Sequence, residues 1–267
     1  MFVTFLSDFG LQDDFVGTCH GVIKQIAPDV QIVDITHGIP PREIVQGALV
    51  LANTLPYMPN GVHLAVVDPG VGGPRRALAL RDREGRLYVG PDNGLLLPAA
   101  ERSGIEEAHE IVNAEYALSP VSRTFHGRDI FAPAAAHLAK GLEPAALGPP
   151  IDPSALVRLE LPQAELRPHR ISATVLYVDA FGNMQLNLTR SHLDEARLEP
   201  GARIELELAG QRYYATTART FSDARSGDLI LYEDSYQNVS VAMNRGNAAE
   251  LLAAQAGQEI RINLDVP

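Results

Sequence analysis

The first half of this chain alternates between strand-like and helix-like patterns, and this alternation most constrains its fold. Three β-rich apolar runs alternate with two stretches of helical periodicity, at residues 2–6, 15–26, 30–35, 42–55 and 64–67. Strand, helix, strand, helix, strand in this order predicts a parallel sheet with helices on both faces. We therefore predict a Rossmann-like α/β domain over residues 1–150.

The pattern changes after this domain. Six prolines between residues 143 and 170 argue against a long helix or a central strand, so we assign residues 151–170 as a proline-rich linker. Short β-rich runs follow, separated by turn residues, at residues 171–178, 184–188, 204–208, 229–231, 239–242 and 260–264. They predict a small β-barrel-like domain over residues 171–267, with a sandwich as the alternative and one helix near residues 248–254.

Charge and cysteine content limit the partners and the compartment. The formal net charge of −11 opposes nonspecific binding to nucleic acid or to an anionic membrane, and it leaves a cationic small molecule acceptable. Cys19 is the single cysteine, so no internal disulfide can form and a cytoplasmic location is expected. No apolar run approaches the roughly 18 residues of a membrane span. The first residues are typical of a strand, not of a signal peptide.

Side chains with catalytic potential follow the third apolar run. Asp68 ends this run, and a segment with three glycines and two prolines leads from it to Arg75 and Arg76. His126 lies further on, in Thr124-Phe125-His126-Gly127-Arg128-Asp129. An acid, a cation and an imidazole in one pocket can hold and polarise a water molecule. The spacing alone also fits a glycine turn followed by a surface ion pair.

Asp8 closes the first strand-like run, where a carboxylate can accept hydrogen bonds from a ribose diol. The alternative is a role in helix capping together with Asp13 and Asp14. No G-x-G-x-x-G fingerprint follows, and Gly70-Val71-Gly72-Gly73 lacks the lysine of a phosphate-binding loop. The sequence therefore gives phosphate transfer little support.

The histidines do not predict a metal site. None of the eight forms an H-x-H pair or an i, i+4 pair. A metal-dependent hydrolase built on Asp8, Asp68, His126 and Asp129 stays open as an alternative, because these side chains could converge in space. Cys19 falls on the apolar face of a predicted helix and is expected to be an inert core residue.

A turn in the second half combines three recognition groups. Asp179-Ala180-Phe181-Gly182-Asn183 follows a strand and is typical of a hairpin turn. It also offers an acid for an ammonium group, an aromatic face for a purine and an amide for an adenine edge. The stretch from Ser235 to Asn244 begins with a hydroxyl and is otherwise typical of a strand with turns at its ends.

Taken together, these motifs resemble the S-adenosyl-L-methionine hydroxide adenosyltransferase family, which comprises adenosine-forming hydrolases related to fluorinating and chlorinating adenosyltransferases. The motifs cover nearly the whole chain in order, and they are Ser7-Asp8-Phe9-Gly10, Val33-Asp34-Ile35-Thr36-His37, Val67-Asp68-Pro69-Gly70-Val71-Gly72, Pro91-Asp92-Asn93-Gly94, Thr124-Phe125-His126-Gly127-Arg128-Asp129-Ile130-Phe131 and Phe181-Gly182-Asn183. The resemblance implies hydrolysis of S-adenosyl-L-methionine to adenosine and L-methionine, by in-line attack of activated water on the ribose C5′ carbon.

The resemblance also implies roles for individual residues. Asp68, Arg75 and His126 match the set that prepares the water or hydroxide, although Arg76 leaves the arginine open by one position. The halogenating relatives lack this set, so water is favoured over halide as the nucleophile. A halide-using adenosyltransferase and a binding module without turnover remain the alternatives.

The implied substrate contacts lie mainly in the second half. Asp8 matches the ribose-binding aspartate, and the groups that resemble the methionine and adenine contacts are Asp179, Phe181, Asn183, Ser235 and the backbone near Met243. The resemblance implies no cofactor, a small-molecule substrate, and a homotrimer with active sites between neighbouring subunits.

Overall fold

The computed structural model describes residues 1–264, which divide into two compact units. One unit is Met1–Leu159, and the other begins at Glu160. The division falls inside the range 151–170 that the prolines mark. Residues 151–159 nevertheless belong to the first unit, because Leu156 is buried in its core and the Val157 amide donates to Asp92 Oδ1 at 2.9 Å.

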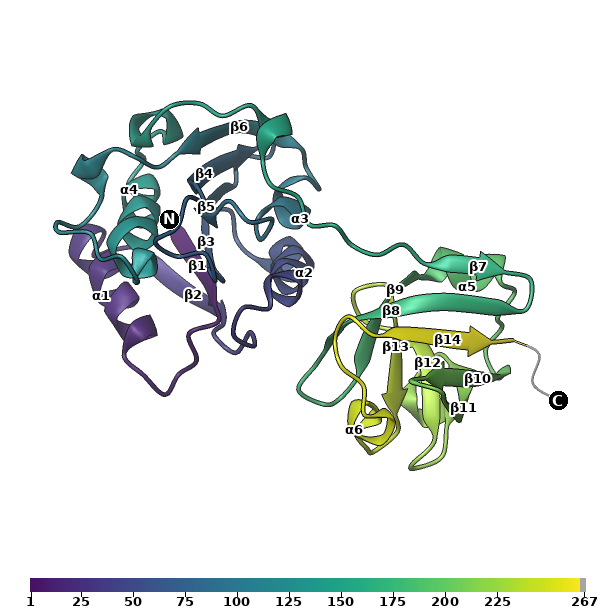
Figure 1. Ribbon diagram of the computed structural model, residues 1–267. Helices are drawn as coiled ribbons and strands as arrows, with labels where there is room; N and C mark the ends of the chain where they lie inside the picture. Colours follow the sequence, from purple (N-terminus) through teal and green to yellow (C-terminus); the bar gives the residue numbers. More distant parts are fainter. Residues whose placement is uncertain (265–267) are drawn as a thin grey trace. The chain divides into compact units, whose positions relative to one another are not determined.

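The first unit is built on a six-stranded sheet in the order β2-β1-β3-β5-β4-β6 (Figure 1). Its strands are β1 (Phe2–Ser7), β2 (Gln31–Thr36), β3 (Val62–Val66), β4 (Ala77–Asp82), β5 (Leu87–Pro91) and β6 (Ile105–Glu110). The first four in this order are parallel, as the alternating pattern predicts. β4 runs antiparallel to both β5 and β6, so the sheet is mixed.

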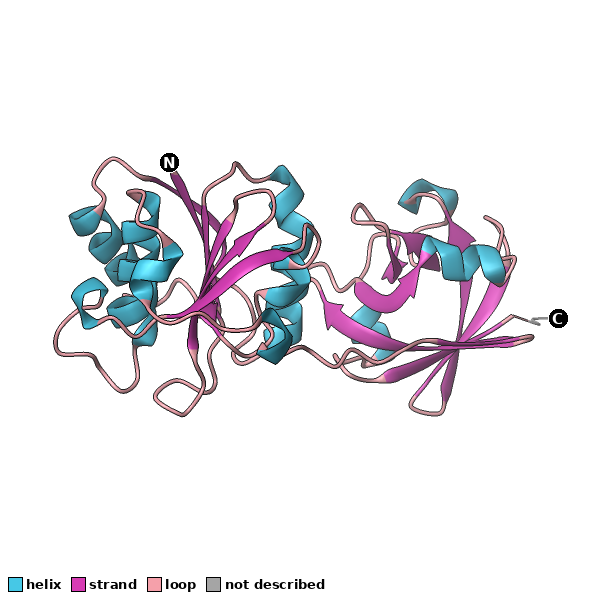
Figure 2. Cartoon of the chain, turned by 90° about the horizontal axis from the view of Figure 1, so that it is seen from above, coloured by secondary structure: helices cyan, strands magenta, loops and turns pink. Residues whose placement is uncertain are grey.

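Helices cover both faces of this sheet (Figure 2). The helices are α1 (Phe15–Ile26), α2 (Ile44–Thr54), α3 (Leu97–Ala100) and α4 (Ala132–Ala139). Successive strand residues point to opposite faces, so Val3 and Phe5 pack in the core beneath α1 and α4, whereas Leu6 packs with α2 and α3. A π-helical turn, η3 (Gly127–Phe131), leads directly into α4 and carries the segment after His126.

The second unit contains a closed β-barrel, as the short β-rich runs predict. Its eight-stranded sheet has the order β14-β10-β11-β12-β13-β9-β8-β7, and a further pairing of β14 with β8 closes the ring and leaves β7 outside it. The strands are β7 (Glu165–Arg167), β8 (Arg170–Val178), β9 (Met184–Thr189), β10 (Arg203–Leu208), β11 (Gln211–Ala218), β12 (Leu229–Glu233), β13 (Asn238–Met243) and β14 (Glu259–Asn263). Alternating apolar side chains fill its interior. The helices of this unit are α5 (Arg190–Glu195) and α6 (Ala248–Leu252).

Short 3-10 turns complete the described part of the chain at Leu55–Tyr57, Ala114–Tyr116, Pro144–Leu147, Pro153–Ala155 and Phe221–Asp223. Asp14 precedes α1, but its side chain makes no capping bond to the backbone and instead accepts from the Thr18 hydroxyl. Within residues 1–264, every helix is too short or too polar to cross a membrane.

Candidate active site

Asp68, Arg75 and His126 form one contact set in the first unit. Asp68 lies two residues beyond β3, and Arg75 lies two residues before β4. Arg75 Nε donates to both carboxylate oxygens of Asp68, at 3.0 and 3.1 Å, and Arg75 Nη2 also contacts Asp68 Oδ2. The same Nη2 lies 2.9 Å from His126 Nδ1. Arg75 therefore bridges the carboxylate and the imidazole.

The backbone and a nearby ring hold Arg75 in this position. Gly72 has a φ of +75°, and a Cβ atom on it would lie 2.2 Å from the Arg123 carbonyl oxygen, so only glycine fits this turn. The Arg75 guanidinium also lies over the Phe131 ring, 5.1 Å from its centroid. The side chains of Arg75 and Asp68 are only 11% and 6% exposed, so their ion pair is largely shielded from water.

The contact with Arg75 determines the protonation of His126. A guanidinium can only donate hydrogen bonds, so His126 Nδ1 accepts and the neutral ring carries its proton on Nε2. Burial and the positive charge of Arg75 lower the pKa of His126, although the charges of Asp68 and Asp129 and a hydrogen bond to the Ser122 backbone oppose this shift. His126 is thus held as a neutral imidazole with a donor at Nε2.

Arg76 does not join this set. Its Nε donates to Asp92 Oδ2 at 2.7 Å, and its Nη2 donates to the Ala155 carbonyl at 2.6 Å. Arg76 thereby connects the segment around residue 155 to Asp92. The sequence leaves open which of the two arginines lies beside Asp68 and His126, and in the structure Arg75 makes these contacts and Arg76 does not.

Asp8 follows β1 directly and is half-buried. Its Oδ2 accepts from the Arg42 amide at 3.0 Å. Burial raises the pKa of Asp8, the backbone hydrogen bond from Arg42 opposes this rise, and the negative charge of Asp68 adds to it. Neither Asp13 nor Asp14 shares this environment, because both are exposed.

Asp129 forms hydrogen bonds to the loop that precedes it and to the adjacent Arg128. Its oxygens accept from Arg128 Nε at 2.6 Å and from the Ser122 amide at 2.7 Å. Burial raises the pKa of Asp129, but these hydrogen bonds and the Arg128 charge outweigh it and keep the pKa low. Among residues 1–264, Asp8, Asp68, His126 and Asp129 do not form a group of three ligand atoms within 4.8 Å of one another.

The second unit contains a cavity of about 650 Å³, a size that suits a nucleoside-sized ligand. It is lined by every residue of this unit that the sequence suggests for substrate contacts, namely Asp179, Phe181, Asn183, Ser235 and Met243. The sequence does not identify several other lining residues, among them Tyr177, Gln185, Phe221 and Tyr232.

The turn between β8 and β9 holds Asp179 and Asn183 together. Asp179 Oδ1 accepts from the amides of Phe181 and Asn183, at 2.8 and 2.9 Å, and its Oδ2 accepts from Asn183 Nδ2 at 2.8 Å. Gly182 has a φ of +81°, as this turn requires. Phe181 remains 79% exposed, which is unusual for so large an apolar ring. The turn therefore presents an open aromatic face and the side-chain Oδ1 of Asn183, while the Asn183 backbone oxygen accepts from the Asp179 amide at 3.0 Å.

Gln185 is the most informative of the lining residues that sequence patterns do not reveal. It is 3% exposed and lines the cavity, yet neither its amide nitrogen nor its amide oxygen has a hydrogen-bond partner within the described residues. A buried amide without partners is costly unless a ligand or water satisfies it. In the sequence it is one polar residue between the apolar Met184 and Leu186.

Two family models match the chain in order. They are the SAM hydroxide adenosyltransferase N-terminal domain, over residues 3–148, and the C-terminal domain of the same family, over residues 173–261. The chain belongs to the SAM hydroxide adenosyltransferase family. The Asp68, Arg75 and His126 set lies within the first match, and the cavity residues lie within the second.

Similar proteins of the SAM hydroxide adenosyltransferase family carry enzyme names. A protein of Salinispora arenicola named (R)-S-adenosyl-L-methionine hydrolase is 46% identical over 97% of both chains. One of Thermus thermophilus with the same name is 40% identical, over 97% of this chain and 98% of its own. A fluorinase of Actinopolyspora mzabensis is 28% identical over 97% and 96%. The named hydrolases are thus closer to this member than the fluorinase is.

Solved structures support the fold of this family member. An uncharacterized conserved protein from Thermotoga maritima matches with a TM-score of 0.90 and 34% identity, over 97% of this chain and 99% of the other. A conserved hypothetical protein from Thermus thermophilus matches with a TM-score of 0.76 and 38% identity, over 97% and 98%. The α/β unit and the barrel unit therefore both belong to a fold seen in crystal structures.

Proposed function

We propose that this chain hydrolyses S-adenosyl-L-methionine to adenosine and L-methionine. The observation that carries the proposal is the bridge that Arg75 makes between Asp68 and His126, since it builds a shielded group of donors suited to a small anionic nucleophile. Relatives 40–46% identical over nearly the full length bear the name (R)-S-adenosyl-L-methionine hydrolase. We extend the proposal to the (R) form at the sulfonium because both of these names specify it.

The reaction needs little from the protein at the leaving group. The hydroxide oxygen forms a bond to C5′ while the C5′–S bond breaks, and the electron pair of the broken bond goes to sulfur. The sulfonium thereby becomes the neutral thioether of methionine, so no acid must protonate the leaving group. If water enters, its extra proton passes to solvent. Catalysis then depends on placing hydroxide in line with C5′ and keeping other water away.

The tautomer of His126 defines its part in the reaction. With Nδ1 accepting from Arg75, the ring can donate from Nε2 to the nucleophilic oxygen but cannot take a proton at that atom. Arg75 and His126 together therefore favour hydroxide over water by supplying positive charge and N–H donors. Asp68 holds the guanidinium in place and offsets its charge.

Asp8 accepts from the ribose hydroxyls in this proposal, since its second carboxylate oxygen is not used by the Arg42 amide. In the barrel cavity, Asp179 and Ser235 hold the amino acid portion, Phe181 stacks on adenine, and Asn183 and the backbone near Met243 bind its edge. The side-chain amide of Gln185, which has no hydrogen-bond partner among the described residues, forms a further hydrogen bond to the ligand. No cofactor takes part.

We also propose that the protein assembles as a homotrimer and works in the cytoplasm. The family resemblance implies a homotrimer with active sites between neighbouring subunits. The single buried cysteine agrees with a reducing cytoplasm.

Incubation of the purified chain with the separated (R) and (S) sulfonium forms tests the function. We expect adenosine and methionine in equal amounts, with the (R) form consumed faster. Absence of adenosine over a broad pH range, with the ligand bound but unchanged, would instead identify a binding module. Faster formation of 5′-halo-5′-deoxyadenosine than of adenosine in chloride or fluoride would identify a halide-using adenosyltransferase.

A further inference from the structure

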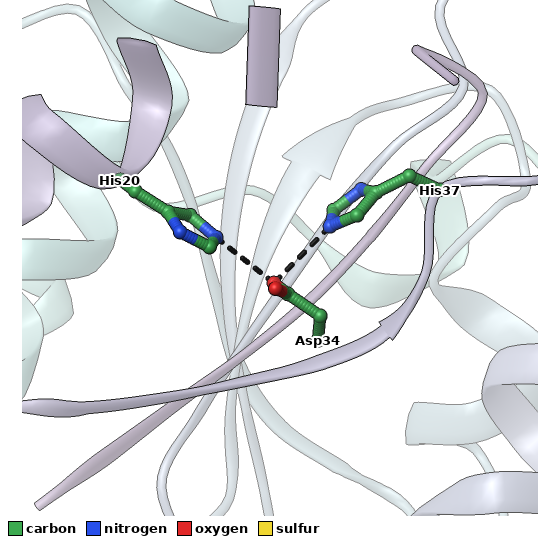
Figure 3. Close-up of side chains that lie close together, drawn as sticks. All are labelled: His20, Asp34 and His37. Atoms are coloured by element: carbon green, nitrogen blue, oxygen red, sulfur yellow. Dashed lines mark hydrogen bonds and ion pairs between the residues drawn. The ribbon is translucent and has the colours of Figure 1, made fainter. Parts of the chain in front are cut away.

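A second cluster of ionisable side chains lies outside the set around Arg75. It comprises His20 on α1, Asp34 on β2 and His37 just after β2, and Figure 3 shows both imidazoles pointing at the Asp34 carboxylate. His20 Nε2 lies 2.9 Å from Asp34 Oδ1, and His37 Nε2 lies 3.1 Å from the same oxygen. Within residues 1–264, this is the one group of three such side chains whose ligand atoms all lie within 4.8 Å of one another.

The environment of His37 points to a ligand at this cluster. Its side chain is 3% exposed, and its Nδ1 lies 2.7 Å from Ser7 Oγ. Its Nε2 is buried, and its one polar contact among the described residues is the ion pair with Asp34 Oδ1 at 3.1 Å. Histidines that bind metals usually donate their other ring N–H to a neighbouring oxygen, and Ser7 Oγ can accept such a bond from His37 Nδ1.

The donor set and its spacing suit a transition metal. Two imidazole nitrogens and one carboxylate oxygen favour Zn²⁺ and similar ions over Mg²⁺ or Ca²⁺. With zinc-to-ligand distances of about 2.0–2.1 Å, ligand atoms on a tetrahedron are about 3.3 Å apart. The nitrogen-to-oxygen distances of 2.9 and 3.1 Å are close to this spacing, and the two nitrogens, which lie within 4.8 Å of each other, would move together around the ion. Asp34 is 42% exposed, which leaves a fourth position for water.

We propose that His20, Asp34 and His37 bind one divalent transition-metal ion of the Zn²⁺ class. The ion joins α1 to the end of β2, and through His37 it supports the segment that carries Asp8. Ser7 contacts His37 Nδ1, and the Gly10 amide donates to the His37 carbonyl at 2.8 Å, so both sides of Asp8 are tied to this histidine. The site stabilises the first unit and takes no part in activating water.

Metal binding by the full chain, after treatment with a chelator, tests this site directly. Calorimetry with ZnCl₂ and the visible spectrum of bound Co²⁺ should both give one ion per chain. A bound ion should also raise Tm as its free concentration exceeds Kd. The affinity should fall more than about tenfold in His20→Gln and in Asp34→Asn, since loss of outer-shell partners alone costs about 10–100-fold.

His109→Gln is the matched control. His109 Nε2 lies 2.8 Å from Glu107 Oε2, a histidine–carboxylate pair like that of His20 but without a third ligand. The affinity of the His109→Gln variant for Zn²⁺ should equal that of the wild type. His20 and Asp34 are partly exposed, so their variants are expected to fold. Failure of the wild type to bind one ion, or equal affinity in His20→Gln, Asp34→Asn and wild type, would overturn the proposal without bearing on the hydrolase reaction.

Discussion

Arg75 Nη2 lies 2.9 Å from His126 Nδ1, and this contact determines which imidazole nitrogen carries the proton. Since the guanidinium cannot accept, the neutral ring donates from Nε2. In our proposal, a histidine in this state donates a hydrogen bond to hydroxide instead of removing a proton from water. The role that we propose for His126 therefore depends on Arg75 as much as on its own ring.

Removal of either donor should slow the reaction and leave binding largely intact. Loss of one donor to a developing or bound anion typically costs about 10²–10³-fold in kcat, so we expect this for Arg75→Ala and His126→Ala. The measurements are kcat from adenosine formation and Kd from calorimetry. Arg76→Ala is the matched control, because Arg76 contacts Asp92 and Ala155 instead. Near-normal kcat in both of the first two variants would contradict the mechanism.

The pH dependence of the rate should report His126. Its pKa is lowered by burial and by Arg75, so the ring stays neutral to a pH below its usual range near 6.5. Protonation at Nδ1 would place an N–H against the guanidinium and disrupt the contact. We therefore expect kcat to fall as the pH drops through this lowered pKa. In His126→Gln this acidic decline should disappear, whereas its persistence would assign it to another group.

Asp8 should act in binding more than in the chemical step. Asp8→Ala removes the acceptor proposed for the ribose hydroxyls, which should weaken adenosine binding by about 1–3 kcal/mol. Asp13→Ala is a suitable control, because Asp13 is an exposed carboxylate nearby in the sequence. Calorimetric titration of both variants with adenosine measures the effect. Equal affinity in the two variants would mean that Asp8 serves only to hold the Arg42 segment.

Gln185 should have opposite effects on stability and on affinity. Gln185→Met replaces two unpartnered amide atoms with an apolar group of similar length, so the ligand-free protein should keep or increase its Tm. The affinity for adenosine or methionine should fall, because the amide contacts the ligand in our proposal. Thermal unfolding and calorimetry on the same variant separate the two effects. A lower Tm with unchanged affinity for both ligands would give Gln185 a purely structural role.

The sequence predicts secondary structure and short turns better than it predicts assembled side chains. The strand and helix runs of the first half and the short strands of the second follow from apolar periodicity, which leaves a barrel and a sandwich as alternatives for the second half. Apolar periodicity does not reveal β6 and β11, because charged or polar residues interrupt their apolar pattern. Glu107 is such a residue on β6, and it forms an ion pair with Arg81 on the neighbouring strand β4. Pairing with a neighbouring strand, and not composition, makes these segments strands.

For the candidate sites, too, sequence patterns reveal adjacent groups but not groups that the fold brings together. The recognition groups of the turn from Asp179 to Asn183 can be identified because they are adjacent in sequence. The choice between Arg75 and Arg76 depends on the turn geometry at Gly72, which spacing cannot supply. The cluster of His20 and His37 around Asp34 joins separate elements, so no short spacing rule identifies it.

His63 should make the protein less stable in mild acid. It is fully buried, its Nδ1 lies 2.8 Å from Thr4 Oγ1, and burial, with a smaller effect of Arg86, lowers its pKa to about 4. The unfolded chain has a histidine pKa near 6.5, so between about pH 4 and 6.5 the unfolded state binds more protons than the folded state. The free energy of unfolding should therefore fall as the pH drops through this window.

Denaturant unfolding of wild type and His63→Gln at pH 7.5 and pH 5 measures this effect. Glutamine does not titrate and retains a donor and an acceptor for Thr4, so the variant should lose less stability between the two pH values, whatever its stability at pH 7.5. The variant should still lose some stability between pH 7.5 and pH 5, since burial also lowers the pKa values of His37 and His137. His192→Gln is the control, because His192 is partly exposed at the start of α5. If His63→Gln and wild type lose equal stability, His63 is not the buried group that titrates.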